Sequence, residues 1–505
     1  MMRPDGQVLV GERSLEHPLF GGFTVFPGGM VQPEDEEVAS AVFGESSHAA
    51  VTRATALREL FEEAGVYLDG QRLVAAPPPL RDRPFLEMHR AVGRPRPASA
   101  SDANREPTAP ALGSLLLEAG RWHTPSFAPA SIDAHFFFAA VAETSAGLTP
   151  TPGRAELTNL RFDAPNRILE ARARFEVTLA LPTHVQLQAL ARAGPPIPNP
   201  EIAAHLRALV GAGGEGREGV DDLEVLPDIV VVPLKTPTLP PATHTNAYLL
   251  GGDRWVVVDP ASHASEEREK LLKAIDKHAR GRLEAIVLTH HHADHIGSAA
   301  WLAHALNVPI RAHPITRTLL SAKIPILETL DEGDTLDLGL DGLGRRFVLE
   351  VLFTPGHAPG HIVLVDQREG GRALIAGDMV AGQGSIIIDP PDGNMATYLE
   401  QLARLAALPD KILLPAHGPP VVGSRRKLNA YIEHRNERES LILEAVGAGE
   451  SPKHPVDLLD KAYRDTPKFL HPIAARSCLA HLEKLAAEGR VIREGNRFRR
   501  VSGRQ

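Results

Sequence analysis

The chain has 505 residues, more than one hydrophobic core usually supports, so we expect a multidomain protein with two or three domains. Hydrophobic residues make up 43% and charged residues 23%, a composition that excludes wholesale disorder. The net charge of −9 argues against a chain that coats nucleic acid or an anionic membrane through bulk charge. The single cysteine, Cys478, excludes an intramolecular disulfide, so a metal site would use histidine and carboxylate ligands.

The first residues, MMRPDGQVLV, lack a basic region followed by an apolar run. No stretch approaches the roughly 18 uncharged apolar residues that span a bilayer. We therefore expect a cytoplasmic protein with no membrane partner.

Two segments near the N-terminus predict a cation site. They are FPGGM at residues 26–30 and RELFEEAGV at residues 58–66. In a helix, Glu59, Glu62 and Glu63 lie at positions i, i+3 and i+4, so their carboxylates share one face and could gather Mg²⁺ or Mn²⁺ around a diphosphate. Arg58 could orient these carboxylates, and Gly65 is expected to end the helix. The alternative is a solvated acidic helix.

These segments resemble the two halves of a Nudix box. The resemblance implies that residues 1–210 form a Nudix hydrolase-like domain, an α/β/α sandwich that cleaves small-molecule diphosphates with Glu59 in a catalytic role. The box is split, because 22 residues separate Asp35 from Arg58 and Asp35 stands where the family has Glu. A comparable split occurs in the Nudix subfamily that includes peroxisomal coenzyme A diphosphatases, so the insertion is compatible with activity.

A linker is expected at residues 211–224, where the glycine-rich GAGGEGREG follows the proline cluster GPPIPNPE. After it, the chain alternates short β-rich runs with helical patterns. IVVVPL, AYLLGG, RWVVVDP and AIVLTH read as strands, and EEREKLLKAIDKHA reads as a helix. Residues 225–430 are therefore predicted to form an α/β domain.

Histidine and aspartate residues cluster at the ends of these β-rich runs. The segment LTHHHADHIG contributes His290, His292, Asp294 and His295, and later segments contribute His357, Asp378 and His417. Zinc accepts imidazole nitrogen and carboxylate oxygen, and a loop after a strand can direct alternating side chains to one point. The alternative to a metal site is that some of the chain's 23 histidines cluster by chance and that Asp378 and His417 only cap turns.

This pattern resembles the metallo-β-lactamase superfamily over about residues 228–430, because the H-x-H-x-D-H motif, a later His, an Asp and a final His occur in order. The resemblance implies an αββα sandwich that binds two Zn²⁺. It places His290, His292 and His357 on one ion, Asp294, His295 and His417 on the other, and Asp378 between them. His291, His313 and His361 are expected to be structural or to orient a neighbouring ligand. Two zinc ions can activate a shared water for hydrolysis, with Asp294 also orienting the hydroxide.

Residues 431–505 carry helical patterns in RESLILEAV, VDLLDKAY and AARSCLAHLEKLAAEG, followed by the hairpin-like VIREGNRFRRV. This order resembles the winged-helix-like extension of β-lactamase-like single-stranded-RNA endonucleases. It implies that the tail could bind phosphates through five arginines: Arg490, Arg493, Arg497, Arg499 and Arg500. The alternative is that these charges are only solvated.

The sequence leaves three functions open. A phosphodiesterase acting on single-stranded RNA is favoured by the tail. A thioester or acyl hydrolase, as in the glyoxalase II branch, is favoured by an upstream domain of the coenzyme A type. A nucleic-acid-binding or partner-binding protein with vestigial sites is the third, and the complete ligand set argues against it. The sequence does not determine the oligomeric state.

Overall fold

The computed structural model of the chain divides into two compact units at Val220 and Asp221. None of the helices in its described part is both long and apolar enough to cross a membrane. The structure describes all residues except 18, 70–71, 78–80, 82, 93–114, 125–131, 145–146, 152–155, 194–220, 321, 323, 448–450 and 502–505.

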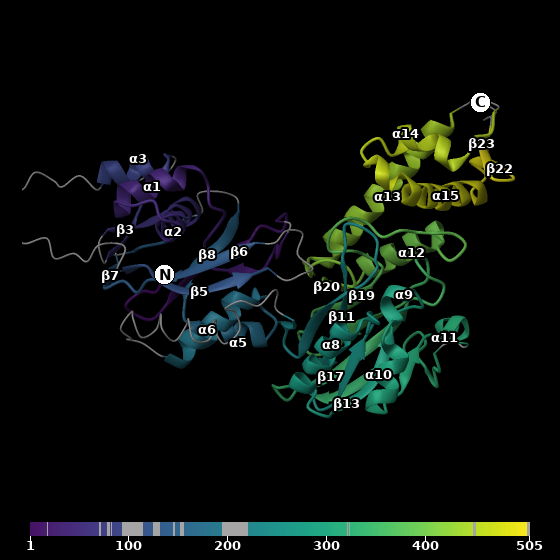
Figure 1. The fold of residues 1–505 in the computed structure, drawn as a ribbon, viewed down its shortest axis with the longest axis horizontal. Helices are drawn as coiled ribbons and strands as arrows, with labels where there is room; N and C mark the ends of the chain where they lie inside the picture. The colour runs from purple at the N-terminus through teal and green to yellow at the C-terminus, as the bar shows by residue number, and fades with distance from the viewer. Residues whose placement is uncertain are drawn as a thin grey trace, which may run out of the picture. The chain divides into compact units, whose positions relative to one another are not determined.

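The first unit arranges helices on both sides of a small antiparallel sheet (Figure 1). Its elements are β1 (Val8–Arg13), β2 (Thr24–Val25), α1 (Glu34–Phe43), α2 (His48–Ala64), β3 (Val66–Asp69), β4 (Arg72–Ala75), α3 (Phe85–Val92), β5 (Leu117–His123), β6 (Asp133–Phe138), β7 (Glu143–Thr144), β8 (Leu157–Asp163), α5 (Pro165–Ala173) and α6 (Leu181–Ala193). Side chains alternate between the two faces of strand β1. Leu9 packs in the core formed with α1, α2 and α3, while Val8 and Val10 pack in the core formed with α5 and α6.

The insertion that splits the acidic motif folds into a helix of its own. Helix α1 packs along α2, and both contribute to one core. Helix α2 begins at Ser47, whose side chain accepts from the Ala50 backbone N–H at 3.3 Å, and ends at Gly65 with a φ of 63°. Gly65 therefore ends the helix, as the sequence predicted.

The second unit contains two sheets with a helix on the outer side of each (Figure 1). One sheet has the order β15-β14-β13-β12-β11-β10-β9, and the other has the order β16-β17-β18-β19-β20-β21. The strand and helix predictions after residue 225 are confirmed. The elements are β9 (Leu223–Leu226), β10 (Ile229–Lys235), β11 (His244–Gly251), β12 (Trp255–Val258), α8 (Ser265–His278), β13 (Leu283–Leu288), α9 (Ala293–Ile296), α10 (Ala299–Leu306), β14 (Ile310–Ala312), α11 (Pro314–Leu320), β15 (Glu328–Thr329), β16 (Thr335–Leu340), β17 (Arg346–Phe353), β18 (Ile362–Asp366), β19 (Ala373–Gly377), α12 (Met395–Ala406), β20 (Ile412–Pro415) and β21 (Val421–Val422).

Hydrogen bonds join the two sheets at one end. The Tyr248 hydroxyl on β11 donates to the carbonyl of Pro415 on β20 at 2.8 Å, and the backbone N–H of Ile362 donates to the Thr289 carbonyl at 2.9 Å. Helix α8 packs on the core of the first sheet, and α12 packs on the core of the second. The loops that follow β13, β17, β19 and β20 therefore meet at a common edge.

The remaining residues form a helical module with a two-stranded hairpin, as predicted. The expected boundary between residues 430 and 431 falls inside a continuous helix, because Leu428 packs on the core of the second sheet while Ile442 packs in the C-terminal module. The linker expected at 211–224 lies mostly outside the described residues, and β9 includes its last two positions. The C-terminal elements are α13 (Ser424–Val446), η2 (Pro455–Leu458), α14 (Leu459–Ala462), η3 (Lys468–Leu470), α15 (His471–Ala487), β22 (Val491–Glu494) and β23 (Arg497–Arg500).

A buried carboxylate fastens α13 to the C-terminal module. Glu439 accepts from Lys484 Nζ at 2.9 and 3.0 Å and from Arg490 at 3.0 Å. Burial by itself would raise the pKa of Glu439, but hydrogen bonds from His481 and Lys484 lower it to about 2.

We expect Glu439→Gln to destabilise the C-terminal module by about 2 kcal/mol at pH 7, because charge-assisted hydrogen bonds are lost. The pKa is lowered in the fold, so its stabilising contribution is present above the unfolded value and is lost as the pH falls toward about 2. Thermal unfolding followed from pH 7 to pH 2.5 should show the two proteins converging. Glu488→Gln, at a more exposed partner of Lys484, is the control and should change little.

Candidate functional site

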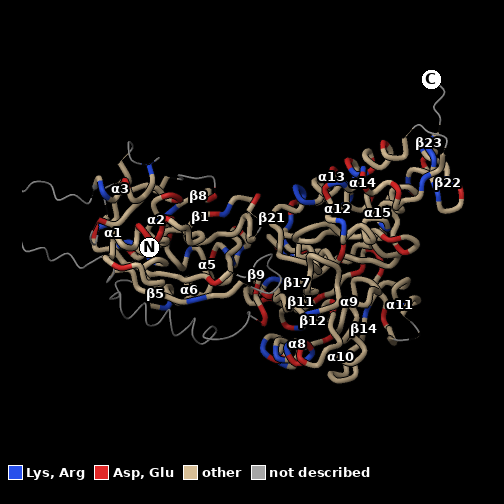
Figure 2. Tube along the Cα trace, turned by 45° about the horizontal axis from the view of Figure 1, so that its top comes forward, with Lys and Arg blue, Asp and Glu red and all other residues tan. Residues whose placement is uncertain are grey.

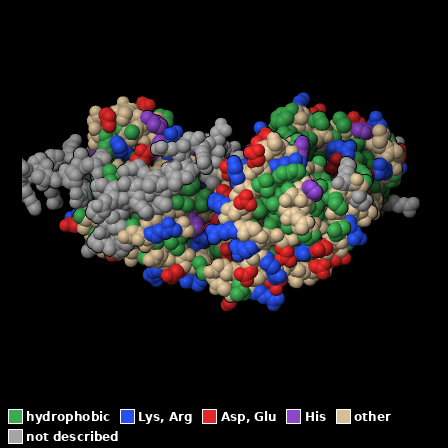
Figure 3. Space-filling model, turned by 60° about the horizontal axis from the view of Figure 1, so that its bottom comes forward, with side chains coloured by type: hydrophobic (Ala, Val, Ile, Leu, Met, Phe, Trp, Pro, Cys, Tyr) green, Lys and Arg blue, Asp and Glu red, His purple; other side chains and the backbone are tan. Residues whose placement is uncertain are grey.

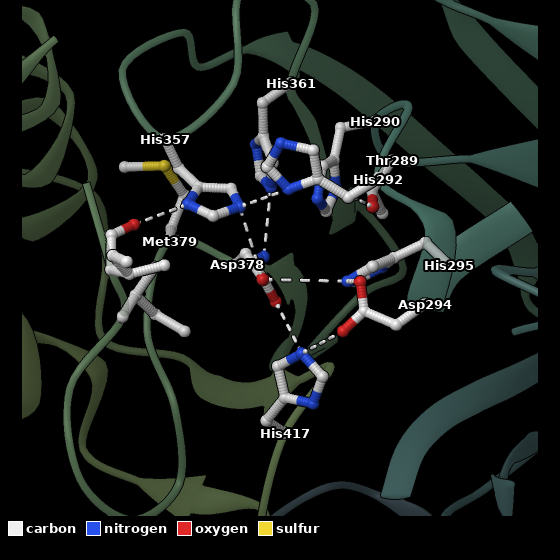
Figure 4. A network of polar contacts seen from close by, with 12 residues as sticks. Thr289, His290, His292, Asp294, His295, His357, His361, Asp378, Met379 and His417 are labelled. Atoms are coloured by element: carbon white, nitrogen blue, oxygen red, sulfur yellow. Dashed lines mark hydrogen bonds and ion pairs between the residues drawn. The ribbon is translucent and has the colours of Figure 1, made fainter. Parts of the chain in front are cut away.

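Seven side chains predicted as metal ligands converge at the edge where the two sheets meet (Figure 4). Each follows a strand: two lie in the loop after β13, two on the short helix α9, and one each after β17, β19 and β20. Their ligand atoms form three groups with all separations within 4.8 Å: His290, His292 and His357; His290, His295 and Asp378; and Asp294, His295 and His417. The structure thus brings together the two triads that the sequence resemblance implied.

Asp378 occupies the middle of this cluster (Figure 4). One carboxylate oxygen lies 3.3 Å from His357 Nε2 and 3.6 Å from His295 Nε2, and the other lies 3.4 Å from His417 Nε2. Asp294 reaches the same space, with Oδ2 3.6 Å from His417 Nε2. Asp378 therefore faces members of both triads and could contribute an oxygen ligand to either one.

The side of each histidine that faces away from the cluster is held by a hydrogen-bond partner. Thr289 donates its hydroxyl hydrogen to Asp259 at 2.6 Å, so its oxygen can accept from His290 Nδ1 at 3.0 Å. Asp259 also accepts from His295 Nδ1 at 2.8 Å. The other three histidines have equivalent partners: His292 Nε2 with Asp392 at 3.3 Å, His357 Nδ1 with the Ile387 carbonyl at 2.9 Å, and His417 Nδ1 with the His244 carbonyl at 3.1 Å.

These outer hydrogen bonds determine which nitrogen carries the proton. In its neutral form, an imidazole that donates through its outer nitrogen has a lone pair on the other nitrogen, so each of the five histidines would then direct a lone pair inward. His290 Nε2, His295 Nε2 and Asp378 Oδ1 are buried and have no hydrogen-bond partner. Buried lone pairs without donors fit cations as their partners, so this donor set fits two ions that accept nitrogen and oxygen ligands.

The electrostatics agree with a site that attracts positive charge. Burial raises the pKa of Asp378 by itself, but His417 and His295 hold it well below its usual value, so the carboxylate is charged. Burial lowers the pKa of His290 well below its usual value and that of His357 to about 4, so both imidazoles are neutral near pH 7. Neutral imidazole is the form that binds a metal.

The three histidines predicted to be structural lie outside the ligand groups implied by the resemblance. His361 accepts through Nε2 from the Asp378 backbone N–H at 3.0 Å, so it orients that residue as predicted. His313 stacks on Phe353 with ring centroids 4.1 Å apart. His291 donates to Asp392 at 2.9 Å. Sequence reasoning missed Asp392 and also Asp259, whose position at the end of the RWVVVDP run was the only available signal.

A second arrangement of carboxylates surrounds Arg58 on α2. This buried guanidinium donates twice to Asp35, at 2.7 and 3.0 Å, and its third nitrogen donates to Glu59 at 2.8 Å and Glu62 at 2.9 Å. The pairing joins residues on either side of the insertion, so Asp35 does meet Arg58 in space. Arg58 thus orients the glutamates as the sequence predicted.

Glu63 turns toward the glycine loop. It accepts from the Gly28 backbone N–H at 2.7 Å, and burial raises its pKa to about 8. An added Cβ at Gly29 would lie 2.3 Å from Glu59 Oε1, so a side chain there would displace the Glu59 carboxylate from its present position. Glu156, which sequence reasoning missed, is close enough to raise the pKa of both Glu59 and Glu63.

The three α2 glutamates do not meet as one compact ligand group. All groups of ligand atoms within 4.8 Å in the described part of the chain belong to the second unit. Glu59 and Glu62 instead point their carboxylates at Arg58. The binding of Mg²⁺ or Mn²⁺ by Glu59, Glu62 and Glu63 stays a prediction.

Four of the five C-terminal arginines that the sequence offers as phosphate ligands form ion pairs, and their binding of phosphates stays a prediction. Figure 2 shows basic and acidic positions close together along this module, and Figure 3 shows blue and red side chains interspersed over one face of the second unit. Only Arg500 makes no ion pair within the described residues. The other four pair as follows: Arg490 with Glu439 and Glu488, Arg493 with Glu483, Arg497 with Asp457, and Arg499 with Glu494.

Two family models match the second unit. The model described as the metallo-beta-lactamase superfamily matches residues 240–417, which include all seven candidate ligands. The model described as a beta-lactamase associated winged helix domain matches residues 455–500.

Individual relatives and solved structures are also similar to parts of this chain. The beta-lactamase-like protein 2 homolog of Caenorhabditis elegans is 30% identical over 260 residues, covering 49% of this chain and 80% of the relative. An atrochrysone carboxyl ACP thioesterase of Aspergillus fumigatus is 25% identical over 209 residues, covering 40% of this chain and 59% of the relative. A crystal structure of a beta-lactamase domain protein from Burkholderia ambifaria is 25% identical with a TM-score of 0.49, covering 55% of this chain and 93% of the other.

We expect His295→Ala to reduce the zinc content of the purified protein from about two ions per chain to about one or fewer, because His295 belongs to two of the ligand groups. His313→Ala is the matched control, since this histidine is also buried but lies outside those groups. Elemental analysis after dialysis measures the content. Equal zinc contents in the two variants would contradict the site.

Proposed function

This chain belongs to the metallo-beta-lactamase superfamily, and from this premise we propose that its His/Asp cluster is the active site of a hydrolase that uses two zinc ions. The observation that carries the proposal is the set of five histidines whose outer nitrogens are engaged and whose inner nitrogens lie in the cluster that contains Asp378. A vestigial site would not need to keep every outer partner. This argues against a purely binding role.

The residues of the chain have distinct tasks in this proposal. Two divalent cations held there would lower the pKa of a shared water and polarise the oxygen of the bond to be cleaved. Asp294 is the carboxylate best placed to orient that water, because its side chain is 22% exposed whereas that of Asp378 is 8% exposed. Asp378 and the five histidines hold the centre together.

We propose an acyl thioester as the substrate class. One relative, from Aspergillus fumigatus, is named as an atrochrysone carboxyl ACP thioesterase. The ion pairs of four C-terminal arginines also remove much of the positive charge that a phosphodiester backbone would need. A thioester carbonyl requires only a polarised oxygen and a nucleophilic water at the metal centre.

Single-stranded RNA is the second candidate substrate. It is supported by the winged-helix match, by the exposed Arg500, and by the small energy of exposed ion pairs, which is about 0–1 kcal/mol and lets arginines change partners. Arg490 is the exception, because its partner Glu439 is buried.

For the first unit we propose a Nudix-type diphosphate hydrolase with Mg²⁺ or Mn²⁺. Support comes from Arg58, which joins Asp35 to Glu59 and Glu62 across the insertion, and from Gly28, whose N–H holds Glu63. A divalent cation would have to displace Arg58 contacts and draw Glu59, Glu62 and Glu63 together. The elevated pKa of Glu63 implies that cation binding releases a proton and strengthens from pH 6 to pH 9.

The substrate class is tested by assaying the purified protein on an acyl-coenzyme A thioester and on fluorogenic single-stranded RNA in parallel. We expect thioester hydrolysis that is lost with chelator and falls at least about 100-fold in Asp378→Ala, since this carboxylate faces both triads. RNA cleavage without thioester cleavage would select the second candidate. Activity that persists in Asp378→Ala would refute the metal mechanism, and absence of both activities would favour a binding protein.

The first unit is tested with coenzyme A as the diphosphate substrate and Mn²⁺ as the cation. We expect Glu62→Gln to abolish diphosphate cleavage, because it removes a ligand and an Arg58 partner, while thioester hydrolysis stays unchanged. Glu37→Gln, at an exposed glutamate on α1, serves as the control. Equal loss of both activities in Glu62→Gln would show that the two units do not act independently.

A further inference from the structure

One loop of the second unit contacts two histidines of the metal centre and a third beside it. Residues 384–392, called here the 384–392 loop, lie between β19 and α12. The carbonyl of Ile387 accepts from His357 Nδ1 at 2.9 Å. At the end of the loop, Asp392 Oδ2 accepts from His291 Nε2 at 2.9 Å and from His292 Nε2 at 3.3 Å. Two of the five ligand histidines therefore depend on this loop for their outer partner.

Side chains from the C-terminal helices hold the same loop. On α13, the Tyr431 hydroxyl donates to the Gly384 carbonyl at 2.8 Å, and the Arg435 guanidinium donates to the Ile386 carbonyl. On α15, Arg476 pairs with the Asp389 carboxylate and donates to the Pro390 carbonyl at 3.2 Å. The loop is thus fastened along its length to helices that do not contribute metal ligands.

His292 is the ligand histidine that most needs such a partner. Its side chain is 30% exposed, whereas those of His357 and His417 are 3% and 7% exposed. Packing fixes the buried rings, but an exposed ring can rotate and present either nitrogen. A carboxylate on Nε2 fixes the ring and leaves the lone pair on Nδ1, the atom that lies 3.0 Å from His357 Nε2.

We propose that Asp392 is a positioning residue of the metal centre and that the C-terminal helices hold it in place through the 384–392 loop. The C-terminal module then has a role at the active site that requires no contact with substrate. The inference concerns metal binding, so it holds or fails independently of the substrate class proposed above.

A third cation on His291, His292 and Asp392 is the competing interpretation, since these residues also form a group within 4.8 Å. The distances of 2.9 and 3.3 Å from a single carboxylate oxygen to two ring nitrogens are those of hydrogen bonds. Only His292 is shared with the main centre. We therefore assign Asp392 to orientation, and a metal content above two per chain that falls by one in Asp392→Ala would overturn this assignment.

The first experiment measures zinc affinity of the full chain by competition with a chromophoric chelator, for wild type, Asp392→Asn and Asp392→Ala. We expect the weaker zinc to lose about 10- to 100-fold in affinity in Asp392→Ala, as for other outer partners of metal-binding histidines. Asp392→Asn should be intermediate, because its amide oxygen still accepts a hydrogen bond. The Co²⁺-substituted protein should show a changed visible absorption spectrum in Asp392→Ala.

Unfolding of the metal-free proteins separates positioning from general damage. We expect metal-free Asp392→Ala to unfold within about 2 °C of wild type, because its partners are partly exposed histidines. Unchanged zinc affinities and an unchanged Co²⁺ spectrum in Asp392→Ala would overturn the proposal.

The second experiment compares Arg476→Ala with Arg493→Ala. Both arginines lie in the C-terminal module, both side chains are 51% exposed, and each forms an ion pair, but only Arg476 contacts the 384–392 loop. We expect Arg476→Ala to weaken zinc binding several-fold and Arg493→Ala to leave it unchanged, with similar small effects on unfolding. Equal zinc affinities in the two variants would refute the link between the C-terminal helices and Asp392.

Discussion

The metal centre depends on hydrogen bonds that point away from it. Asp259 is central, because it holds both Thr289 and His295, and the parallel pairing of β12 with β13 places it beside them. Its backbone lies in the left-handed region, with a φ of 49°, a conformation that Asp tolerates better than most residues and that accumulates at functional sites. Lone pairs gathered this closely are unfavourable without cations, so the fold stabilises an arrangement that only metal binding completes.

The sequence predicted those site residues that lie close together in the chain or directly follow a predicted strand. The motif around His290 and the residues that follow three later strands identified the seven side chains of the His/Asp cluster, because a strand followed by a short loop places its next side chains at the sheet edge. It was uninformative about Asp392, whose partners lie 100 and 101 residues away. The same limit applies to the arginines, since the partner of Arg490 lies 51 residues earlier on α13. Pairings of this kind are set by tertiary packing.

The acidic motif of the first unit shows how a fold absorbs an insertion. The segment between Asp35 and Arg58 forms most of α1 and the beginning of α2, and the packing of these helices returns Asp35 to Arg58. Continuity of the motif in sequence was therefore unnecessary for the ion pair. The ion pair does not by itself arrange the glutamates around a cation, because Arg58 neutralises Glu59 and Glu62 in their present positions.

Helix α13 begins at Ser424 in the metal-binding domain and ends at Val446 in the winged-helix module without a break. An uninterrupted helix of this length resists bending and twisting far more than a peptide tether. The winged-helix module is therefore not free to reorient independently of the metal-binding domain. A force that rotates the winged-helix module would therefore also rotate α13. Tyr431 and Arg435 on α13 would transmit this rotation to the 384–392 loop, which supports two of the ligand histidines.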